Sequence, residues 1–242
     1  MFTGIIQAVA EIEYVEDHDA IRTFTIQFPP GFCDDLRVGA SVSVDGVCLT
    51  ATKLLSPDRV AFDVILQSLR VTTLSDCEAG FRVNVERAAK DGAEIGGHPI
   101  SGHIDFAAVV HSVASLEGNK VLRVTIPEEF RRYLFPKGYV AINGASLTLA
   151  EVDRDHGWFE VWLIPETRRM TVFEDKVAGD YLNIEIERQT QVVVDTIRDS
   201  VRETLGRLQP VVEALLLDRG VVLEDLLQPG VLAITDHARQ RR

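Results

Sequence analysis

The segment SVSVDGVCLT (residues 41–50) and the segment YVAINGASLT (residues 139–148) decide the fold. In each segment, apolar residues alternate on both sides of an Asp-Gly or Asn-Gly pair. Such a pair is the strongest short signal for a β-hairpin, because both turn positions need a positive φ. The sequence therefore predicts two equivalent hairpins, placed 98 residues apart.

Other segments repeat at nearly the same spacing. AGFRVNVE (residues 79–86) returns 99 residues later as AGDYLNIE (residues 178–185), and Thr3-Gly4 returns 98 residues later as Ser101-Gly102. Several anchors in one order with a nearly constant spacing are the sequence signature of a repeat. We therefore predict two tandem copies of one domain, residues 1–97 and 98–189, followed by a separate segment, residues 190–242.

Both copies are predicted to be all-β. Short runs of alternating apolar residues are separated by turn residues, and many such strands favour a small closed barrel that leaves no exposed sheet edge. We also expect short helices near residues 30–36 and 127–133. The predicted strands outside the hairpins are residues 23–28, 60–66, 83–86, 120–126, 158–163 and 182–186.

The period of the apolar pattern changes near residue 190, where apolar residues begin to recur every three or four positions. This spacing, with charged residues between, predicts an amphipathic helix that has no counterpart within the repeat. Its apolar stripe needs a partner surface, either helices of other protomers or the protein's own barrels. We expect Pro210 to end this helix, and residues 211–232 again have helical spacing. The stripe consists of Val194, Ile197, Val201, Leu205 and Leu208.

Composition excludes several classes of protein. The 242 residues are 46% hydrophobic with a net charge of −12, which argues against a nucleic-acid or anionic-membrane binder, since those need a basic face. No apolar run approaches the roughly 20 residues of a membrane helix, and the N-terminal residues lack a secretory signal. Three cysteines without a C-x-x-C pair argue against a disulfide framework and fit a reducing cytoplasm.

The two copies differ in polar residues at equivalent positions. Cys48 in the first hairpin corresponds to Ser146 in the second, and Ile5 corresponds to His103. Residues common to both copies are explained by structure, whereas polar differences point to divided functions. We therefore expect two pockets that bind two copies of one ligand and treat them unequally.

The second copy opens with a stretch rich in glycine and histidine, Gly96-Gly97-His98 and then Ser101-Gly102-His103. Glycine lets the backbone approach a ligand closely, and histidine can carry a proton near neutral pH. Two other interpretations stay open: a turn whose histidines bind backbone groups, and zinc ligation by His98 and His103. A metal site is disfavoured because no third ligand accompanies the pair.

Other candidate residues have simpler interpretations beside the functional ones. Cys48 could be a nucleophile, but a lone cysteine on a strand is usually a small buried hydrophobe. Lys137 could neutralise an anionic substrate or be a solvated charge. Glu185 and Glu187 alternate on one predicted strand and so share a face, where they could act as acid and base or simply face solvent.

Taken together, these motifs resemble the riboflavin synthase family over about residues 1 to 205. Eight ordered segments carry the resemblance, which makes it specific. They are MFTGII (1–6), DGVCLT (45–50), VNVERA (83–88), GGH (96–98), SGH (101–103), NGASLT (143–148), LIPET (163–167) and NIEI (183–186).

The resemblance implies two tandem Greek-key six-stranded β-barrels and a C-terminal helical segment that joins protomers into a homotrimer. It implies a transferase that dismutates two molecules of 6,7-dimethyl-8-ribityllumazine into riboflavin and 5-amino-6-ribitylaminouracil, the last step of riboflavin biosynthesis. Each barrel would bind one lumazine, and the site would form between protomers. No metal and no organic cofactor are expected, and lumazine synthase is a candidate partner.

The resemblance also assigns roles to matching residues. His103 is the expected proton-transfer group, and Cys48 or a bound water is the expected transient nucleophile. Ser41, Ser146 and Glu187 are placed near the reacting rings. The expected substrate-binding residues are Phe2, Gly4, Ile5, Ile6, Cys48, Leu49, Thr50, Asp63, Ser68, Gly102, His103, Ile104, Lys137, Ser146, Leu147, Thr148, Ile164 and Thr167.

Two residues depart from the usual pattern of the family. Glu187 stands where the family usually has Asp, and Ser68 stands where Thr is common. A non-catalytic lumazine carrier with the same two barrels is the main alternative, although such carriers lose the Gly-Gly-His and Ser-Gly-His motifs that are intact here. A flavin reductase would need a glycine-rich nicotinamide-binding turn, which the sequence lacks.

Overall fold

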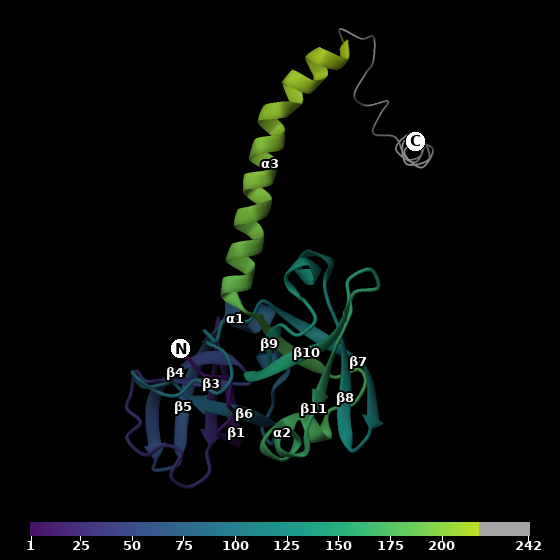
Figure 1. Cartoon of the computed structure of the whole chain (residues 1–242). Coiled ribbons are helices and arrows are strands. Elements are labelled where there is room, and N and C mark those ends of the chain that lie inside the picture. Colours follow the sequence, from purple (N-terminus) through teal and green to yellow (C-terminus); the bar gives the residue numbers. More distant parts are fainter. Residues whose placement is uncertain (218–242) are drawn as a thin grey trace. The chain divides into compact units, whose positions relative to one another are not determined.

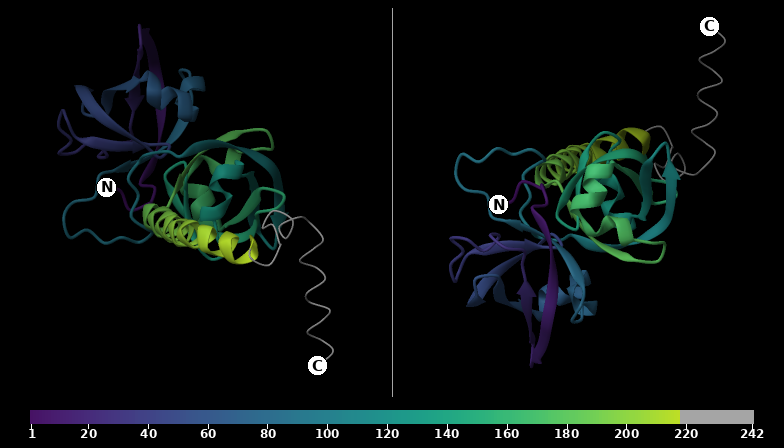
Figure 2. Two further views of the ribbon diagram at one scale, coloured as in Figure 1. Left: turned by 90° about the horizontal axis from the view of Figure 1, so that it is seen from above. Right: turned by 90° about the horizontal axis from the view of Figure 1, so that it is seen from below.

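The chain folds into two closed six-stranded antiparallel barrels followed by a C-terminal helix (Figure 1). The repeat predicted the two copies, the resemblance implied six strands in each, and the apolar spacing after residue 190 predicted the helix. The computed structural model describes residues 1–217. The strands close in the order β1-β2-β5-β4-β3-β6 in the first barrel and β10-β11-β8-β7-β12-β9 in the second, which is the same cyclic order. In both views of Figure 2 the teal and green strands of the second barrel close into a ring.

The elements of the two barrels correspond one to one. The first barrel consists of β1 (Ala8–His18), β2 (Ile21–Gln27), β3 (Ser41–Val44), β4 (Val47–Ser56), β5 (Arg59–Ile65), α1 (Leu66–Val71), the 3₁₀ helix η1 (Thr73–Asp76) and β6 (Arg82–Arg87). The second consists of β7 (Phe106–Leu116), β8 (Asn119–Thr125), η2 (Glu128–Tyr133), β9 (Tyr139–Ile142), β10 (Ala145–Asp153), β11 (Trp158–Leu163), α2 (Pro165–Met170), η3 (Val172–Asp175) and β12 (Tyr181–Ile186).

Both predicted hairpins are present. β3 joins β4 through Asp45 and Gly46, whose φ angles are 44° and 85°. β9 joins β10 through Asn143 and Gly144, whose φ angles are 41° and 80°. Two successive positive φ values define the tight turn that suits the twist of paired strands, and Asp, Asn and Gly tolerate them best.

The core of each barrel comes from the inward side of alternating strands. In β2, Phe24 and Ile26 are fully buried, and they face Phe62 and Val60 of the neighbouring β5. Burying one such side chain contributes about 1.5–3 kcal/mol. The alternation of buried and exposed residues therefore fixes the register of each strand.

Of the two short helices predicted, one is absent and the other is present as a 3₁₀ helix. Residues 30–36 form turns rather than a helix, because Gly31 and Asp35 take φ angles of 83° and 60°, which a right-handed helix cannot accommodate. Residues 128–133 do form a helix, but it is the 3₁₀ helix η2.

The two barrels meet at their hairpin turns. A Cβ atom on Gly46 would lie 2.7 Å from the backbone nitrogen of Gly144, so only glycine fits there. The Asn84 side-chain amide donates to the Asn143 carbonyl (3.1 Å), and the Asn183 amide donates to the Asp45 carbonyl (2.9 Å). The repeat thus pairs with itself, each copy making the same contact with the other.

Asp45 is the one position of this junction where the copies differ in charge, since Asn143 is its counterpart. Burial raises the pKa of Asp45 from 3.8 to about 7, although the backbone N–H of Asn84 donates to its carboxylate at 2.7 Å and opposes the shift. A pKa that is higher in the folded chain gives stability that is complete below about pH 4 and is lost as the pH rises through 7.

We therefore expect this carboxyl alone to lower the free energy of unfolding by about 4 kcal/mol between pH 4 and pH 8. Chemical denaturation across that range measures the slope, and Asp45→Asn should remove this part of it. Asp91→Asn, at an exposed position between β6 and β7, is the control and should keep the wild-type slope. An unchanged slope in Asp45→Asn would contradict the assignment.

The C-terminal helix is α3 (Arg188–Leu217), and it contains Pro210. The expectation that Pro210 ends the helix was wrong. An internal proline removes one hydrogen bond and costs about 3 kcal/mol, but it does not forbid a helix whose apolar spacing continues beyond it. Residues 218–232, the rest of the segment with helical spacing, lie outside the described residues. No helix within residues 1–217 is long and apolar enough to span a membrane.

Candidate functional site

The segment that precedes each barrel makes hydrogen bonds with the other barrel and is called here a crossing segment. The first contains Phe2 and Gly4, and the second contains Ile100 and Gly102. Phe2 and Ile100 pair as an antiparallel bridge, with N–H to O distances of 2.8 and 3.0 Å. Beyond this bridge, the Ser146 N–H donates to the Gly4 carbonyl (2.8 Å), and the Cys48 N–H donates to the Gly102 carbonyl (2.9 Å). Each crossing segment is therefore hydrogen-bonded to the strand residue at which the two copies differ. This residue is Ser146 for the first segment and Cys48 for the second.

Glycine is required at both crossing points. A Cβ atom on Gly4 would lie 2.5 Å from the Cβ of Ser146, and one on Gly102 would lie 2.5 Å from the Cβ of Cys48. Both glycines also have positive φ angles, +78° and +83°, which side chains rarely adopt. Each crossing segment therefore lies closer to the strand of the other barrel than any residue except glycine would permit.

A buried glutamate holds each crossing segment. Glu86 accepts hydrogen bonds from the N–H and hydroxyl of Thr3 (2.6 and 2.7 Å) and from the Gly4 N–H (3.0 Å). Glu185 accepts the same three from Ser101 (2.7 and 2.7 Å) and Gly102 (2.9 Å). Burial raises the pKa of both carboxyls, while the three hydrogen bonds oppose that rise.

Two cavities flank the crossing, at equivalent positions of the repeat. One, of about 420 Å³, is called here the histidine cavity. The other, of about 530 Å³, is called the isoleucine cavity. The histidine cavity is lined by Met1, Pro99, Ile100, Ser101, His103, Glu185, Glu187, Arg188 and Gln189. The isoleucine cavity is lined by Thr3, Ile5, Gln7, Glu86, Arg87, Ala88, Ala89, Lys90, Ala93, Glu94 and Gly96.

The two cavities differ in groups that can carry a proton. His103 and Glu187 line the first, where the equivalent positions of the second hold Ile5 and Ala88. Glu187 follows the last residue of β12, and its carboxylate accepts a hydrogen bond from the Thr190 hydroxyl (2.6 Å). At these two equivalent positions, groups that can carry a proton are therefore present in the histidine cavity only.

His98 has a role that sequence reasoning did not find. Its Nδ1 lies 2.6 Å from the Ser146 hydroxyl, and its ring stacks on Tyr139 with centroids 5.4 Å apart. Burial lowers the pKa of this imidazole, which favours the neutral form. Within residues 1–217 no group of three side chains is placed to hold a metal ion, so zinc ligation by His98 and His103 gains no support.

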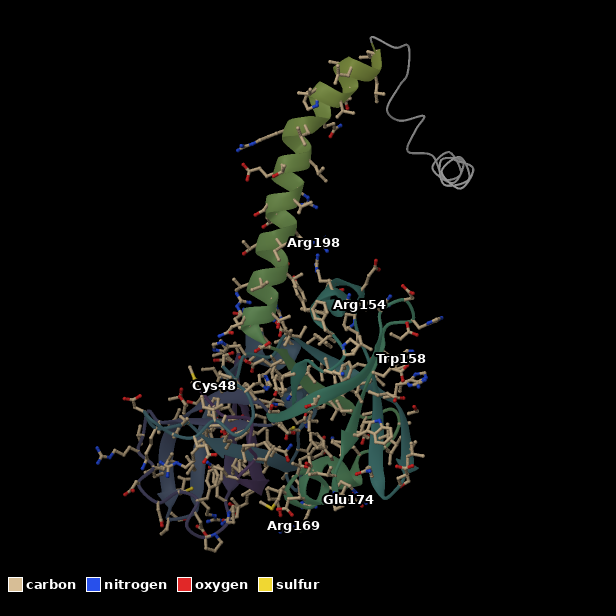
Figure 3. All side chains as sticks on the ribbon, in the orientation of Figure 1. Cys48, Arg154, Trp158, Arg169, Glu174 and Arg198 are labelled. Carbon is tan, nitrogen blue, oxygen red and sulfur yellow. The ribbon has the colours of Figure 1, made fainter. Side chains whose placement is uncertain are left out.

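The other expected site residues fall into two sets. Cys48, labelled in Figure 3, lies on β4 of the first barrel. It is half-buried and lies beside Gly102. The exposed or half-buried set, outside both cavity linings, also includes Ser41, Thr50, Asp63, Ser68, Ile104, Lys137, Ser146, Thr148, Ile164 and Thr167. The buried set is Phe2, Gly4, Ile6, Leu49, Gly102 and Leu147.

Some of these expected residues occupy equivalent positions in the two barrels. Ser68 is the third residue of α1 and Thr167 is the third residue of α2. Phe2 packs with Ile100 and Ala141, and Cys48 packs against the same cluster, so Phe2 supports the crossing. A signal for the crossing was present in the sequence, since Thr3-Gly4 and Ser101-Gly102 repeat.

Comparison with known proteins gives the same picture of a duplicated module. The family model described as "Lumazine binding domain" matches residues 3–88 and again residues 101–187. The riboflavin synthase of Escherichia coli K12 is 41% identical over 198 residues, covering 81% of this chain and 92% of the relative. The riboflavin synthase of Chlamydia pneumoniae is also 41% identical, covering 82% of this chain and 96% of the relative.

Solved structures agree with the fold. LumP in complex with riboflavin superposes with a TM-score of 0.72 and 25% identity, covering 78% of this chain and all of LumP. LumP in complex with 6,7-dimethyl-8-(1'-D-ribityl) lumazine gives a TM-score of 0.70 at 24% identity. With its two lumazine-binding domains and its identity to curated enzymes over most of their length, the chain belongs to the riboflavin synthase family.

Proposed function

We propose that the protein is a riboflavin synthase: it converts two molecules of 6,7-dimethyl-8-ribityllumazine into one riboflavin and one 5-amino-6-ribitylaminouracil. A four-carbon unit passes from one lumazine to the other, so the two products together contain all atoms of the two substrates. The observation that carries this proposal is the duplicated crossing, at whose equivalent positions one copy holds His103 and Glu187 and the other holds Ile5 and Ala88.

The reaction asks little of the protein's own groups. The 7-methyl group of 6,7-dimethyl-8-ribityllumazine is an unusually strong carbon acid, because the negative charge of its anion delocalises into the electron-poor ring. The protein must hold two rings face to face, which lowers the barrier mainly through proximity and orientation. It must also remove and return protons, which is general acid–base catalysis.

His103 is the proposed proton-transfer group. Its side chain is exposed, and it follows Gly102, whose carbonyl accepts the Cys48 N–H of the first barrel. Glu187 lines the same cavity and would assist this proton transfer. Cys48 or a bound water would add transiently to the acceptor ring, with Ser41 and Ser146 beside it.

The remaining expected residues would bind the two lumazines, one per barrel. Those of the first barrel would hold one ring and its ribityl chain, with Thr50, Asp63 and Ser68 exposed or half-buried on β4, β5 and α1. Thr148, Ile164 and Thr167 would do the same in the second barrel. Lys137, which precedes β9, would face the neighbouring protomer's site.

We further propose a homotrimer joined through α3, with each reaction site formed by the first barrel of one protomer and the second barrel of another. The sequence of α3 supports self-association. Val194, Val201, Leu208 and Leu215 recur at every seventh position, the spacing of a coiled-coil seam. Ile197 and Val211 fall on the second position of the same seam, and most of these side chains are exposed.

A cytoplasmic location is part of the proposal. Cys33, Cys48 and Cys77 are all free thiols, and free thiols persist in a reducing compartment. An association with lumazine synthase stays a prediction of the resemblance.

The second candidate function is a lumazine or flavin carrier, favoured by the likeness to the LumP complexes. Incubation with pure 6,7-dimethyl-8-ribityllumazine separates the two. The enzyme should form one riboflavin for every two lumazines consumed, without added cofactor. A protein that binds lumazine tightly and consumes none would be a carrier, and the proposal would be wrong.

A further inference from the structure

The carboxylate of Glu185 is buried beneath the segment that carries His103. Only 5% of Glu185 is exposed. Its Oε1 accepts hydrogen bonds from the N–H and the hydroxyl of Ser101, and its Oε2 accepts one from the Gly102 N–H. The Ser101 hydroxyl oxygen then accepts the His103 N–H at 3.2 Å. Glu185 is therefore linked to the backbone of His103 through one residue.

These bonds leave Glu185 unsuited to proton transfer itself. Both of its oxygens are engaged by donors of the crossing segment, and a carboxylate held by three donors is anchored rather than free to react. On its other side, the segment is fixed by the hydrogen bond between the Gly102 carbonyl and the Cys48 N–H. Residues 101 and 102 are thus held from both sides, and His103 begins where this fixation ends.

The first copy contains the same device without a proton carrier. Glu86 is also buried and makes the three equivalent bonds to Thr3 and Gly4. The Thr3 hydroxyl accepts the Ile5 N–H at 3.3 Å, as the Ser101 hydroxyl does for His103. The chain therefore supplies its own matched control: an identical clamp whose segment leads to isoleucine.

We propose that Glu185 is the positioning residue for proton transfer, because it holds the backbone that presents the His103 imidazole to the histidine cavity. This inference rests on the proposed function, since it assumes that His103 moves the proton. Glu86 by contrast positions a segment that contributes only binding contacts. Misplacing a reacting group by about 1 Å can cost on the order of 100-fold in rate.

Glu185→Gln tests the proposal, since one of the two carboxylate oxygens becomes an NH₂ that faces an N–H donor. We expect kcat to fall about 10- to 100-fold with a much smaller change in KM. In a His103→Ala background, Glu185→Gln should cause no further fall, because both changes remove the same step. Glu86→Gln should act mainly on KM, and its effect should multiply with that of His103→Ala.

A second, milder pair of variants tests the same proposal if Glu185→Gln does not fold. Ser101→Ala breaks the link between Glu185 and the His103 N–H while leaving the carboxylate in place, and Thr3→Val is its counterpart in the first copy. Ser101→Ala should lower kcat, and its effect should also vanish in the His103→Ala background. Glu185→Asp, which keeps both oxygens, should recover part of the rate lost in Glu185→Gln.

NMR of the His103 imidazole gives a readout that does not depend on turnover. Its signals should shift in Glu185→Gln and Ser101→Ala but not in Glu86→Gln or Thr3→Val. If the effects of Glu185→Gln and His103→Ala multiply, or if the imidazole signals stay in place, the positioning role is refuted. If His103→Ala turns over like wild type while the signals do shift, the proton-transfer role of His103 fails instead.

Discussion

Replacement of His103 by alanine is expected to lower kcat for riboflavin formation by about 100-fold or more, the usual contribution of one general acid–base group. Binding of lumazine should change far less, because the rings are held mainly by stacking and by contacts from both barrels. Stopped-flow turnover and fluorescence titration with lumazine measure the two effects separately. Exchange of the 7-methyl protons of bound lumazine in D₂O should slow together with kcat.

The control for this variant is His111→Ala, an exposed histidine on β7 that lies outside the cavity linings. It should behave as wild type in all three measurements. A His103→Ala protein that exchanges the 7-methyl protons and forms riboflavin at the wild-type rate would remove His103 from the reaction.

Ending the chain after Gln191 is expected to give monomers whose activity is lower by about 100-fold or more, since the two rings are then no longer held together. The cut keeps Gln191, whose amide donates to both oxygens of Asp105 (3.0 and 2.9 Å), so this contact with the second barrel is preserved. It removes the seam of α3, and with it the proposed contact between protomers. Sedimentation velocity and turnover, measured on one preparation, check both expectations.

A chain ending after Leu217 is the matched control, because it keeps every seam position from Val194 to Leu215. It should remain assembled and active. Fully active monomers from the shorter chain would show that one protomer contains the whole site, and the shared-site model would then be wrong.

Much of the fold could be predicted because its signals are local. The Asp45-Gly46 and Asn143-Gly144 turns need only two residues each, and the repeat itself implied that both halves share one architecture. β1 and β7 were missed for a physical reason. Their second halves are exposed on both faces, so the alternation that marks a half-buried strand is lost there.

The site could be predicted only in part. The repeat singled out Cys48 against Ser146 and Ile5 against His103, since those differences are visible in the sequence. The repeat of Thr3-Gly4 as Ser101-Gly102 marked the two crossing segments, but their exchange between barrels was not predicted, because it depends on the long-range pairing of Phe2 with Ile100. Glu185 was expected to share a strand face with Glu187, as a reactive or a solvated pair. Its carboxylate is instead buried and accepts hydrogen bonds from a segment 84 residues away in the chain.

A crystal structure of the assembled protein with a non-reacting lumazine analogue would test the shared, two-ring site most directly. We predict two stacked analogues at each complete site, one held by residues of the first barrel and the other by residues of a neighbour's second barrel, with the His103 imidazole at their edge. Analogues bound singly, in barrels that open to solvent with no second ring within reach, would contradict the account.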